Sequence, residues 1–282
     1  MQFILYKTSL TDIAGEGKEP LVNSVTVLFW LAVLVLVYAS FQSPFWGVVA
    51  VYALCSLPLV SWHVGRAYFD LVVASYFLLA LMNMRKYAIT KDAIRLLLVG
   101  ILAYSVVFTK NEGMVMVVPS LALGFAALWL LARKNPDLPK FSAKSVAIAA
   151  VPFAFIVPHM VFRAVYHLSF NPHSAMAAYG FHADSLKLYW MYFTQWGSFN
   201  VFWYALPLVL AMTWRKWSKP QNLPVAVSLS AMLSAMFAVF SFTNNYTFLL
   251  DQTTINRTLL IFMVPVTYFC ILFLDPSTSE KA

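Results

Sequence analysis

Two charged residues, Arg66 and Asp70, lie four positions apart just before a long apolar stretch of the sequence. In a helical turn this spacing puts both side chains on one face, where they can form an ion pair. A carboxylate at the start of the following helix also binds free backbone N–H groups. Both of these roles are structural. In the alternative interpretation, Asp70 lines an active site. An ionisable group beside an apolar membrane segment costs free energy, and its presence there therefore favours a functional role.

Two further cations have the chemistry that phosphate binding requires. Lys110 and Glu112 lie in a very short turn between two apolar stretches, and Gly113 gives the backbone the conformational freedom that this turn needs. Arg257 lies at the start of the last apolar stretch. A lysine can meet a phosphate as a point charge, and an arginine can hold two of its oxygens at once. A structural role is the alternative for each, since a turn needs polar residues and an interfacial arginine can extend its charge into water.

Metal and cofactor chemistry has weaker support. His167, His173 and His182 lie near Asp184 and could hold a divalent metal, but their spacing fits no short metal-binding motif. The two cysteines lie inside apolar stretches and indicate neither a disulfide framework nor a zinc site. The sequence contains no nucleotide-binding or dinucleotide-binding motif, so no cofactor is predicted with certainty.

The composition places all of these residues in a membrane protein. Of the 282 residues, 61% are hydrophobic and only 11% are charged, whereas soluble domains carry about 25% charged residues. A soluble chain this apolar could not cover its surface with polar groups. The composition therefore excludes an ordinary soluble enzyme, a disordered chain and a DNA-binding domain. The net charge of +8 does not by itself indicate a nucleic-acid partner.

Nine apolar segments are long enough, or nearly so, to cross a bilayer. A bilayer core of about 30 Å needs roughly 20 apolar residues per helix, and backbone groups in lipid must satisfy one another, which favours helices. We therefore expect an all-α fold, a polytopic integral membrane bundle of about nine transmembrane helices. The segments are approximately 21–41, 45–62, 70–84, 93–109, 114–132, 145–163, 199–214, 223–242 and 258–274.

The charges between these segments predict the orientation. Three connections of the same parity, together with Arg95 and the C-terminal tail, carry the whole net charge of +8, and the opposite side is balanced. By the positive-inside rule the basic side is cytoplasmic, in an inner or plasma membrane, and the C-terminus lies there too. The basic residues of the three connections are Arg85, Lys86 and Lys91, then Arg133, Lys134, Lys140 and Lys144, then Arg215, Lys216 and Lys219.

This orientation divides the chain into three parts. Residues 1–20 form an outer segment that lacks the basic start and cleavage site of a signal peptide, residues 21–274 form the transmembrane domain, and residues 275–282 form a cytoplasmic tail. The longest outer loop, 164–198, is dense in aromatic residues, which is typical of an amphipathic helix in the headgroup layer. An outer start without an export signal predicts either a missing upstream segment or a first helix that inserts as a reverse anchor.

Four stretches share their order and spacing with a known family. The most specific is Thr-Lys-Asn-Glu-Gly at 109–113, which ends a stretch that begins at Gly100. The others are Glu-Pro-Leu-Val-Asn at 19–23, the run 57–70 that ends in Gly-Arg-Ala-Tyr-Phe-Asp, and the run 257–265 that begins Arg-Thr-Leu-Leu. They resemble the GT-C superfamily of glycosyltransferases, of the dolichyl-phosphate-mannose mannosyltransferase and aminoarabinose transferase type. The resemblance covers roughly residues 19–132 and 256–274, and the part between agrees only in hydropathy.

The resemblance implies a substrate and a reaction. Such enzymes take a sugar from a polyprenyl-phosphate donor and transfer it, with inversion, to an acceptor on the outer face of the membrane. Asp70 matches the family's second acidic position, near the reaction centre, and is the expected catalytic residue. The residues expected to bind substrate are Lys110 and Arg257, which match positions that hold the donor phosphate, together with Glu112, Arg66 and Tyr68.

In the implied reaction an acceptor nucleophile attacks the anomeric carbon, a carboxylate takes its proton, and cations stabilise the leaving lipid phosphate. Asp70 would orient the acceptor, or act as base if the chain is self-sufficient. The family's catalytic Asp lies in a first outer loop that would precede Met1, and Asp12, Glu16 and Glu19 lie in no matching motif. We therefore expect a truncated or split transferase, whose partners are a lipid-linked sugar, membrane lipid and an N-terminal half chain.

Two other functions fit the same sequence. One is a non-catalytic membrane protein of the same fold that binds polyprenyl phosphates. The other is a lipid or solute transporter, although carriers often place charges at the bilayer midplane and no clear midplane charge is visible in this sequence.

Overall fold

The computed structural model describes residues 19–64, 69–110, 113–140, 142–166, 180–196, 198–250 and 253–279. These residues are almost entirely helical and contain no β-strand, which confirms the all-α prediction for the part described. In chain order the elements are α2 (Glu19–Ala39), α3 (Pro44–Ser56), α4 (Val60–Val64), α5 (Asp70–Thr90), α6 (Ala93–Thr109), η1 (Gly113–Val117), α7 (Val118–Lys134), α8 (Ala143–Ala150), η2 (Val151–Phe155), α9 (Ile156–Val165), α10 (Asp184–Met191), η4 (Tyr192–Trp196), α11 (Asn200–Trp217), α12 (Leu223–Phe242), α13 (Tyr246–Leu250), α14 (Thr253–Leu274) and η5 (Pro276–Ser279).

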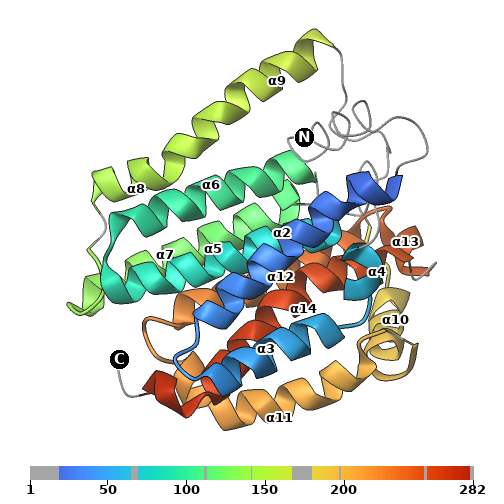
Figure 1. Ribbon diagram of the computed structural model, residues 1–282. Coiled ribbons are helices and arrows are strands. Elements are labelled where there is room, and N and C mark those ends of the chain that lie inside the picture. Colours follow the sequence, from blue (N-terminus) through green and yellow to red (C-terminus); the bar gives the residue numbers. More distant parts are fainter. Residues whose placement is uncertain are drawn as a thin grey trace.

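Helices α5 and α14 form the centre of the bundle (Figure 1). Helix α14 is buried over nearly its whole length, and no residue of α5 between positions 70 and 88 is fully exposed. Helices α2, α6, α12 and α14 all contact α5, while α7 packs against α12. A helix that is apolar on every side needs apolar neighbours on every side. The surrounding helices supply those neighbours to α5.

Local caps fix the helix ends in the connections between the apolar segments. Helix α6 begins after Asp92, whose carboxylate accepts a hydrogen bond from the Ile94 N–H at 3.0 Å. Helix α8 begins with a reciprocal capping box between Ser142 and Ser145. Helix α5 ends at Thr90, and the next residue, Lys91, adopts a left-handed conformation with φ 62°. The chain therefore reverses at the polar positions that the sequence analysis placed between membrane segments.

Small residues let two pairs of helices approach closely. A Cβ atom at Gly124 of α7 would lie 2.8 Å from the Pro224 carbonyl oxygen of α12 and would also collide with the Ser228 hydroxyl. A Cβ atom at Gly100 of α6 would collide with the Ala149 carbonyl oxygen of α8. Glycine at such contacts is typical of helix packing in membranes.

The nine predicted segments all lie on helical residues, but two of them are interrupted. The segment 45–62 is divided into α3 and α4 by a turn in which Leu59 has φ 70°. The segment 145–163 changes from α8 through the 3₁₀ turn η2, which contains Pro152, to α9. Four helical stretches are long and apolar enough to cross a membrane, namely Gly113–Lys134, Ala143–Phe162, Leu223–Phe242 and Thr254–Leu274. The described part of the chain is therefore that of a membrane protein.

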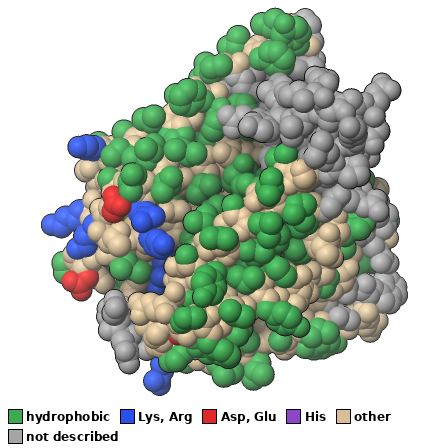
Figure 2. Space-filling model, viewed as in Figure 1, with side chains coloured by type: hydrophobic (Ala, Val, Ile, Leu, Met, Phe, Trp, Pro, Cys, Tyr) green, Lys and Arg blue, Asp and Glu red, His purple; other side chains and the backbone are tan. Residues whose placement is uncertain are grey.

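The surface agrees with this conclusion. Apolar side chains spread over most of the face in Figure 2, and Lys and Arg side chains gather at one end of it. Large apolar side chains on several helices are mainly exposed, including Tyr52 (72%) and Val201 (76%). Apolar exposure on this scale marks a surface that meets another apolar phase. We call the end formed by residues 85–95, 133–140, 142–144 and 215–219 the basic end.

The described part of the predicted outer loop 164–198 packs against the bundle. Helix α10 contacts α12 and α13, and residues 167–179 and 197 lie outside the described residues. Tyr189 and Tyr192 are buried, and the Tyr192 hydroxyl donates a hydrogen bond to the Leu249 carbonyl oxygen at 2.5 Å. Trp190 is 67% exposed. The described stretch therefore packs its tyrosines against the bundle and leaves Trp190 on the surface.

Candidate functional site

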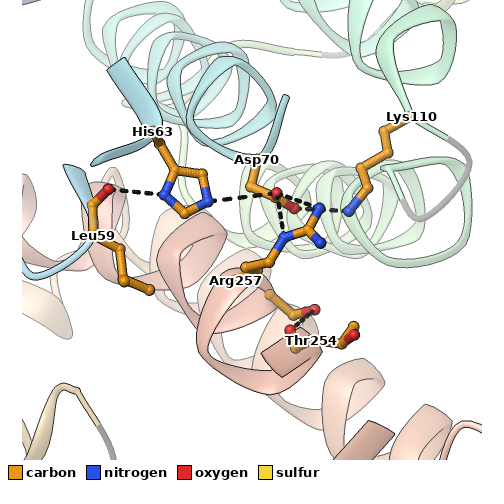
Figure 3. Close-up of polar contacts among 7 residues, drawn as sticks. Leu59, His63, Asp70, Lys110, Thr254 and Arg257 are labelled. Carbon is orange, nitrogen blue, oxygen red and sulfur yellow. Dashed lines mark hydrogen bonds and ion pairs between the residues drawn. The ribbon is translucent and has the colours of Figure 1, made fainter. Parts of the chain in front are cut away.

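The carboxylate of Asp70 is the centre of a charged cluster (Figure 3). The cluster lies at the end of the bundle opposite the basic end, as the course of α5 shows. Asp70 is the first residue of α5 and its side chain is completely buried. The other end of α5 lies twenty residues further along, at Thr90, which belongs to the basic end of the bundle. Because the helix runs through the bundle, Asp70 and the residues around Lys91 are at opposite ends of it.

Lys110 reaches this carboxylate from the neighbouring helix. Its Nζ donates a hydrogen bond to Oδ1 of Asp70 at 2.7 Å. Helices α5 and α6 are consecutive and lie side by side, so the end of α6 returns to the start of α5. Lys110 follows the last helical residue, Thr109, with an extended backbone, and its N–H still bonds the Val106 carbonyl oxygen. The end of the helix thus directs the lysine toward Asp70.

Arg257 contacts the other carboxylate oxygen from a distant part of the sequence. Its Nη2 lies 2.9 Å and its Nε 3.0 Å from Oδ2 of Asp70, although the two residues are 187 positions apart. Arg257 belongs to the first turns of α14, which packs against α5. A charge-assisted bond through two guanidinium nitrogens fixes both distance and direction. The central helix pair therefore determines the geometry of this contact.

His63 is a fourth member of the cluster and was not among the predicted site residues. Its side chain is completely buried in α4, with Nε2 3.6 Å from Oδ2 of Asp70. The ring is oriented by Nδ1, which lies 2.8 Å from the Leu59 carbonyl oxygen. His63 lies seven residues before Asp70, and this spacing was the only signal in the sequence. This signal is weak, because His63 belongs to α4, which ends at Val64, whereas Asp70 begins a separate helix, α5.

The cluster brings two cations onto one buried carboxylate. Removing a carboxylate from water is expensive, and it is tolerated only where opposite charges and hydrogen bonds replace the water. Lys110 and Arg257 supply those charges. The described part of the cluster thus combines two basic side chains with one carboxylate.

Exposure separates the roles of these groups. Asp70 is completely buried, whereas the side chains of Lys110 and Arg257 are 19% and 29% exposed. An incoming ligand would therefore meet the two cations first, with the carboxylate beneath them. Such an arrangement suits an anion, and the carboxylate holds both cations in place before the anion arrives.

The structure brings together three of the predicted site residues, Asp70, Lys110 and Arg257. Arg66, Tyr68 and Glu112 lie outside the described residues, and so does the predicted pair between Arg66 and Asp70.

The predicted metal site receives no support from the part of the chain that the structure describes. That part contains no group of three or more His, Cys, Asp or Glu residues that could hold a metal ion. His182 stacks on the ring of Tyr246, with ring centroids 4.3 Å apart. His167 and His173 are outside the described residues.

Comparison of the chain with protein-family models, with curated proteins and with solved structures gives no match.

Proposed function

We propose that this protein is a membrane glycosyltransferase of the GT-C type, which transfers a sugar from a polyprenyl-phosphate donor to an acceptor on the non-cytoplasmic face. The observation that carries the proposal is the convergence of Lys110 and Arg257 on the buried carboxylate of Asp70. These are the residues at which the sequence resembles that superfamily, and they come from three separate helix ends.

The proposed topology has about nine membrane crossings. The nine apolar segments are largely helical, with a turn inside the segment 45–62, and the central helices are enclosed by others. The basic end carries the lysines and arginines that favour the cytoplasmic side. The tail 275–282 would then be cytoplasmic, and the cluster around Asp70 would face the opposite compartment.

In the proposed reaction the two cations bind the phosphate of the donor lipid. As the acceptor attacks the anomeric carbon, negative charge develops on the departing phosphate, and Lys110 and Arg257 stabilise it. The bond from the sugar to the phosphate oxygen breaks while the bond to the acceptor forms, and the proton lost by the acceptor passes to the released phosphate. A single displacement of this kind inverts the anomeric configuration.

We assign Asp70 a positioning role in this reaction. A general base must reach the proton that it takes, and Asp70 is completely buried with each carboxylate oxygen bound to a cation. Its contribution is to align Lys110 and Arg257 for the phosphate.

The same burial favours the second candidate function, a polyprenyl-phosphate-binding protein without transferase activity. Binding requires only the two cations and their support, and these are already assembled. The two functions predict the same lipid affinity and differ in turnover of a lipid-linked sugar.

A binding measurement on the full chain tests what both functions share. The probes are undecaprenyl phosphate and its neutral alcohol, undecaprenol, added to the detergent-solubilised protein. We expect the protein to prefer the phosphate. Lys110→Ala or Arg257→Ala should each weaken phosphate binding by roughly tenfold or more, since a hydrogen bond to a charged group contributes about 1.5–3 kcal/mol.

Arg215→Ala is the matched control, because it removes one positive charge from the basic end and leaves the cluster intact. Equal affinity for the phosphate and the alcohol, or equal binding by all three variants, would contradict the proposal.

A further inference from the structure

A second candidate binding site lies between α6, α7 and α8, away from the charged cluster. The structure has a cavity of about 440 Å³ there, and its lining is almost entirely apolar. Small side chains leave the space open where Ala103, Ala122 and Ala126 line it, while Gly100 lets α8 approach α6 closely beside it. A cavity of this volume is in the range of ligand pockets.

The cavity has the shape and chemistry for a hydrocarbon chain. Along α7 it extends from Val118 to Trp129, which corresponds to about 16 Å of helix. Long apolar cavities without polar groups do not hold water well. On the membrane-facing surface of a bundle, lipid chains are the hydrocarbon within reach.

One end of the cavity is cationic. Trp129 and Ser145, which line it, lie in the last two turns of α7 and the first turn of α8, at the basic end. The Arg133 guanidinium carbon lies 3.7 Å from the centroid of the Trp129 ring, and Lys144 precedes Ser145 in the chain. Asp137 is the single acidic residue among four basic residues between positions 133 and 144.

We propose that this cavity binds one acyl chain of an anionic phospholipid from the leaflet at the basic end, with the phosphate beside Arg133. Basic sites between transmembrane helices on the cytoplasmic side are typical binding sites for such headgroups. The proposal depends on the orientation of the bundle in the membrane and does not depend on sugar transfer.

The position of the cavity favours this occupant over the polyprenyl chain of the donor. Ala103, at the far end of the cavity on α6, is seven residues from Lys110, or about 10 Å along the helix. The cavity therefore reaches the basic end at Trp129 and Ser145, and on α6 its lining stops seven residues before Lys110.

Native mass spectrometry of the detergent-released full chain tests the proposal, with phosphatidylglycerol, phosphatidylethanolamine and undecaprenyl phosphate as added probes. We expect retention of phosphatidylglycerol above phosphatidylethanolamine of the same chain length. Ala122→Trp, which fills the cavity, should abolish retention. Arg133→Ala should weaken it by roughly fivefold, as expected for one cation near a lipid surface.

Arg215→Ala is the matched control at the same end. Arg215 also lies over a tryptophan, Trp214, but that ring does not line the cavity, whereas Trp129 beneath Arg133 does. Equal weakening by Arg133→Ala and Arg215→Ala would overturn the proposal, since it would indicate attraction to the whole basic end. Retention of undecaprenyl phosphate that is sensitive to Ala122→Trp, without retention of phosphatidylglycerol, would overturn it in favour of the donor chain. If Ala122→Trp does not fold, the two arginine variants still decide between these outcomes.

Discussion

The two ends of the bundle both hold cations, but they hold them by different means. At the cluster end, Lys110 and Arg257 bind one buried carboxylate that belongs to a third helix. At the basic end, neutral oxygen atoms bind two of the cations. The Arg85 Nε donates to the Asn222 side-chain oxygen at 2.7 Å, and the Lys216 Nζ donates to the Asp275 backbone oxygen at 2.8 Å.

This difference indicates what each end is built to do. Cations that only mark the cytoplasmic side can lie near water and bind carbonyl oxygens, which costs little. A fully buried carboxylate is expensive, and partners must be in place to compensate for it. Orientation in the membrane does not require such an arrangement, whereas a preorganised anion site does. The basic end also holds a buried carboxylate, Asp275, but its Oδ1 accepts hydrogen bonds from Ser277. What sets the Asp70 end apart is the contact of two cations with one buried carboxylate, and under the proposed function this is where the anion binds.

The largest expected effect is that of Asp70→Asn. The amide keeps the shape of the side chain but removes its negative charge. The positive charges of Lys110 and Arg257 would then repel each other with no carboxylate between them. We expect a loss of about 3–5 kcal/mol in stability, measured by thermal unfolding in detergent, together with weaker binding of undecaprenyl phosphate.

Asp92→Asn is the matched control for that substitution, since Asp92 is about half exposed and caps α6, a role that asparagine performs equally well. Similar unfolding temperatures for the two variants would show that the buried carboxylate has no special place in the fold, and would remove the distinction between the ends.

A smaller loss is expected from Asn222→Ala at the basic end. Asn222 is 3% exposed, accepts from Arg85 and donates to the Lys216 carbonyl oxygen at 2.8 Å, so its removal leaves buried polar groups without these bonds. We expect a destabilisation of about 1–3 kcal/mol and no change in the binding of undecaprenyl phosphate. A change in that binding comparable with the effect of Arg257→Ala would mean that the two ends are coupled.

Much of this arrangement could be predicted from the sequence because membrane helices have simple rules. The length and apolar character of the segments predict helices, and their alternating direction puts Asp70, Lys110 and Arg257 at the same end. That they form one cluster depends on which helices are neighbours. The packing of α14 and α6 against α5 decides this, and hydropathy carries no information about it.

Other features depend on local breaks that the apolar pattern conceals. The turn at Leu59, with φ 70°, separates α4 from α3 and brings His63 to the carboxylate. The cavity beside Trp129 results from several small residues on three helices, none of which is unusual in its own segment. Such features arise from packing between segments, so a single sequence does not reveal them.

The last prediction concerns positions where substitution should change stability by no more than about 0.5 kcal/mol, since both are exposed. Lys187→Cys lies on α10, at the end of the bundle that holds the Asp70 cluster, because α10 contacts α13 and α13 immediately precedes α14. Lys134→Cys is the matched change at the basic end. Both belong in a Cys55→Ser background, since Cys55 is exposed and Cys270 is buried. With a membrane-impermeant maleimide on intact cells, position 187 should be labelled at once and position 134 only after permeabilisation. Labelling of both positions from one side would contradict the assignment of the two ends to opposite faces. The reverse pattern would put the Asp70 cluster in the cytoplasm, where the proposed transfer on the outer face could not occur.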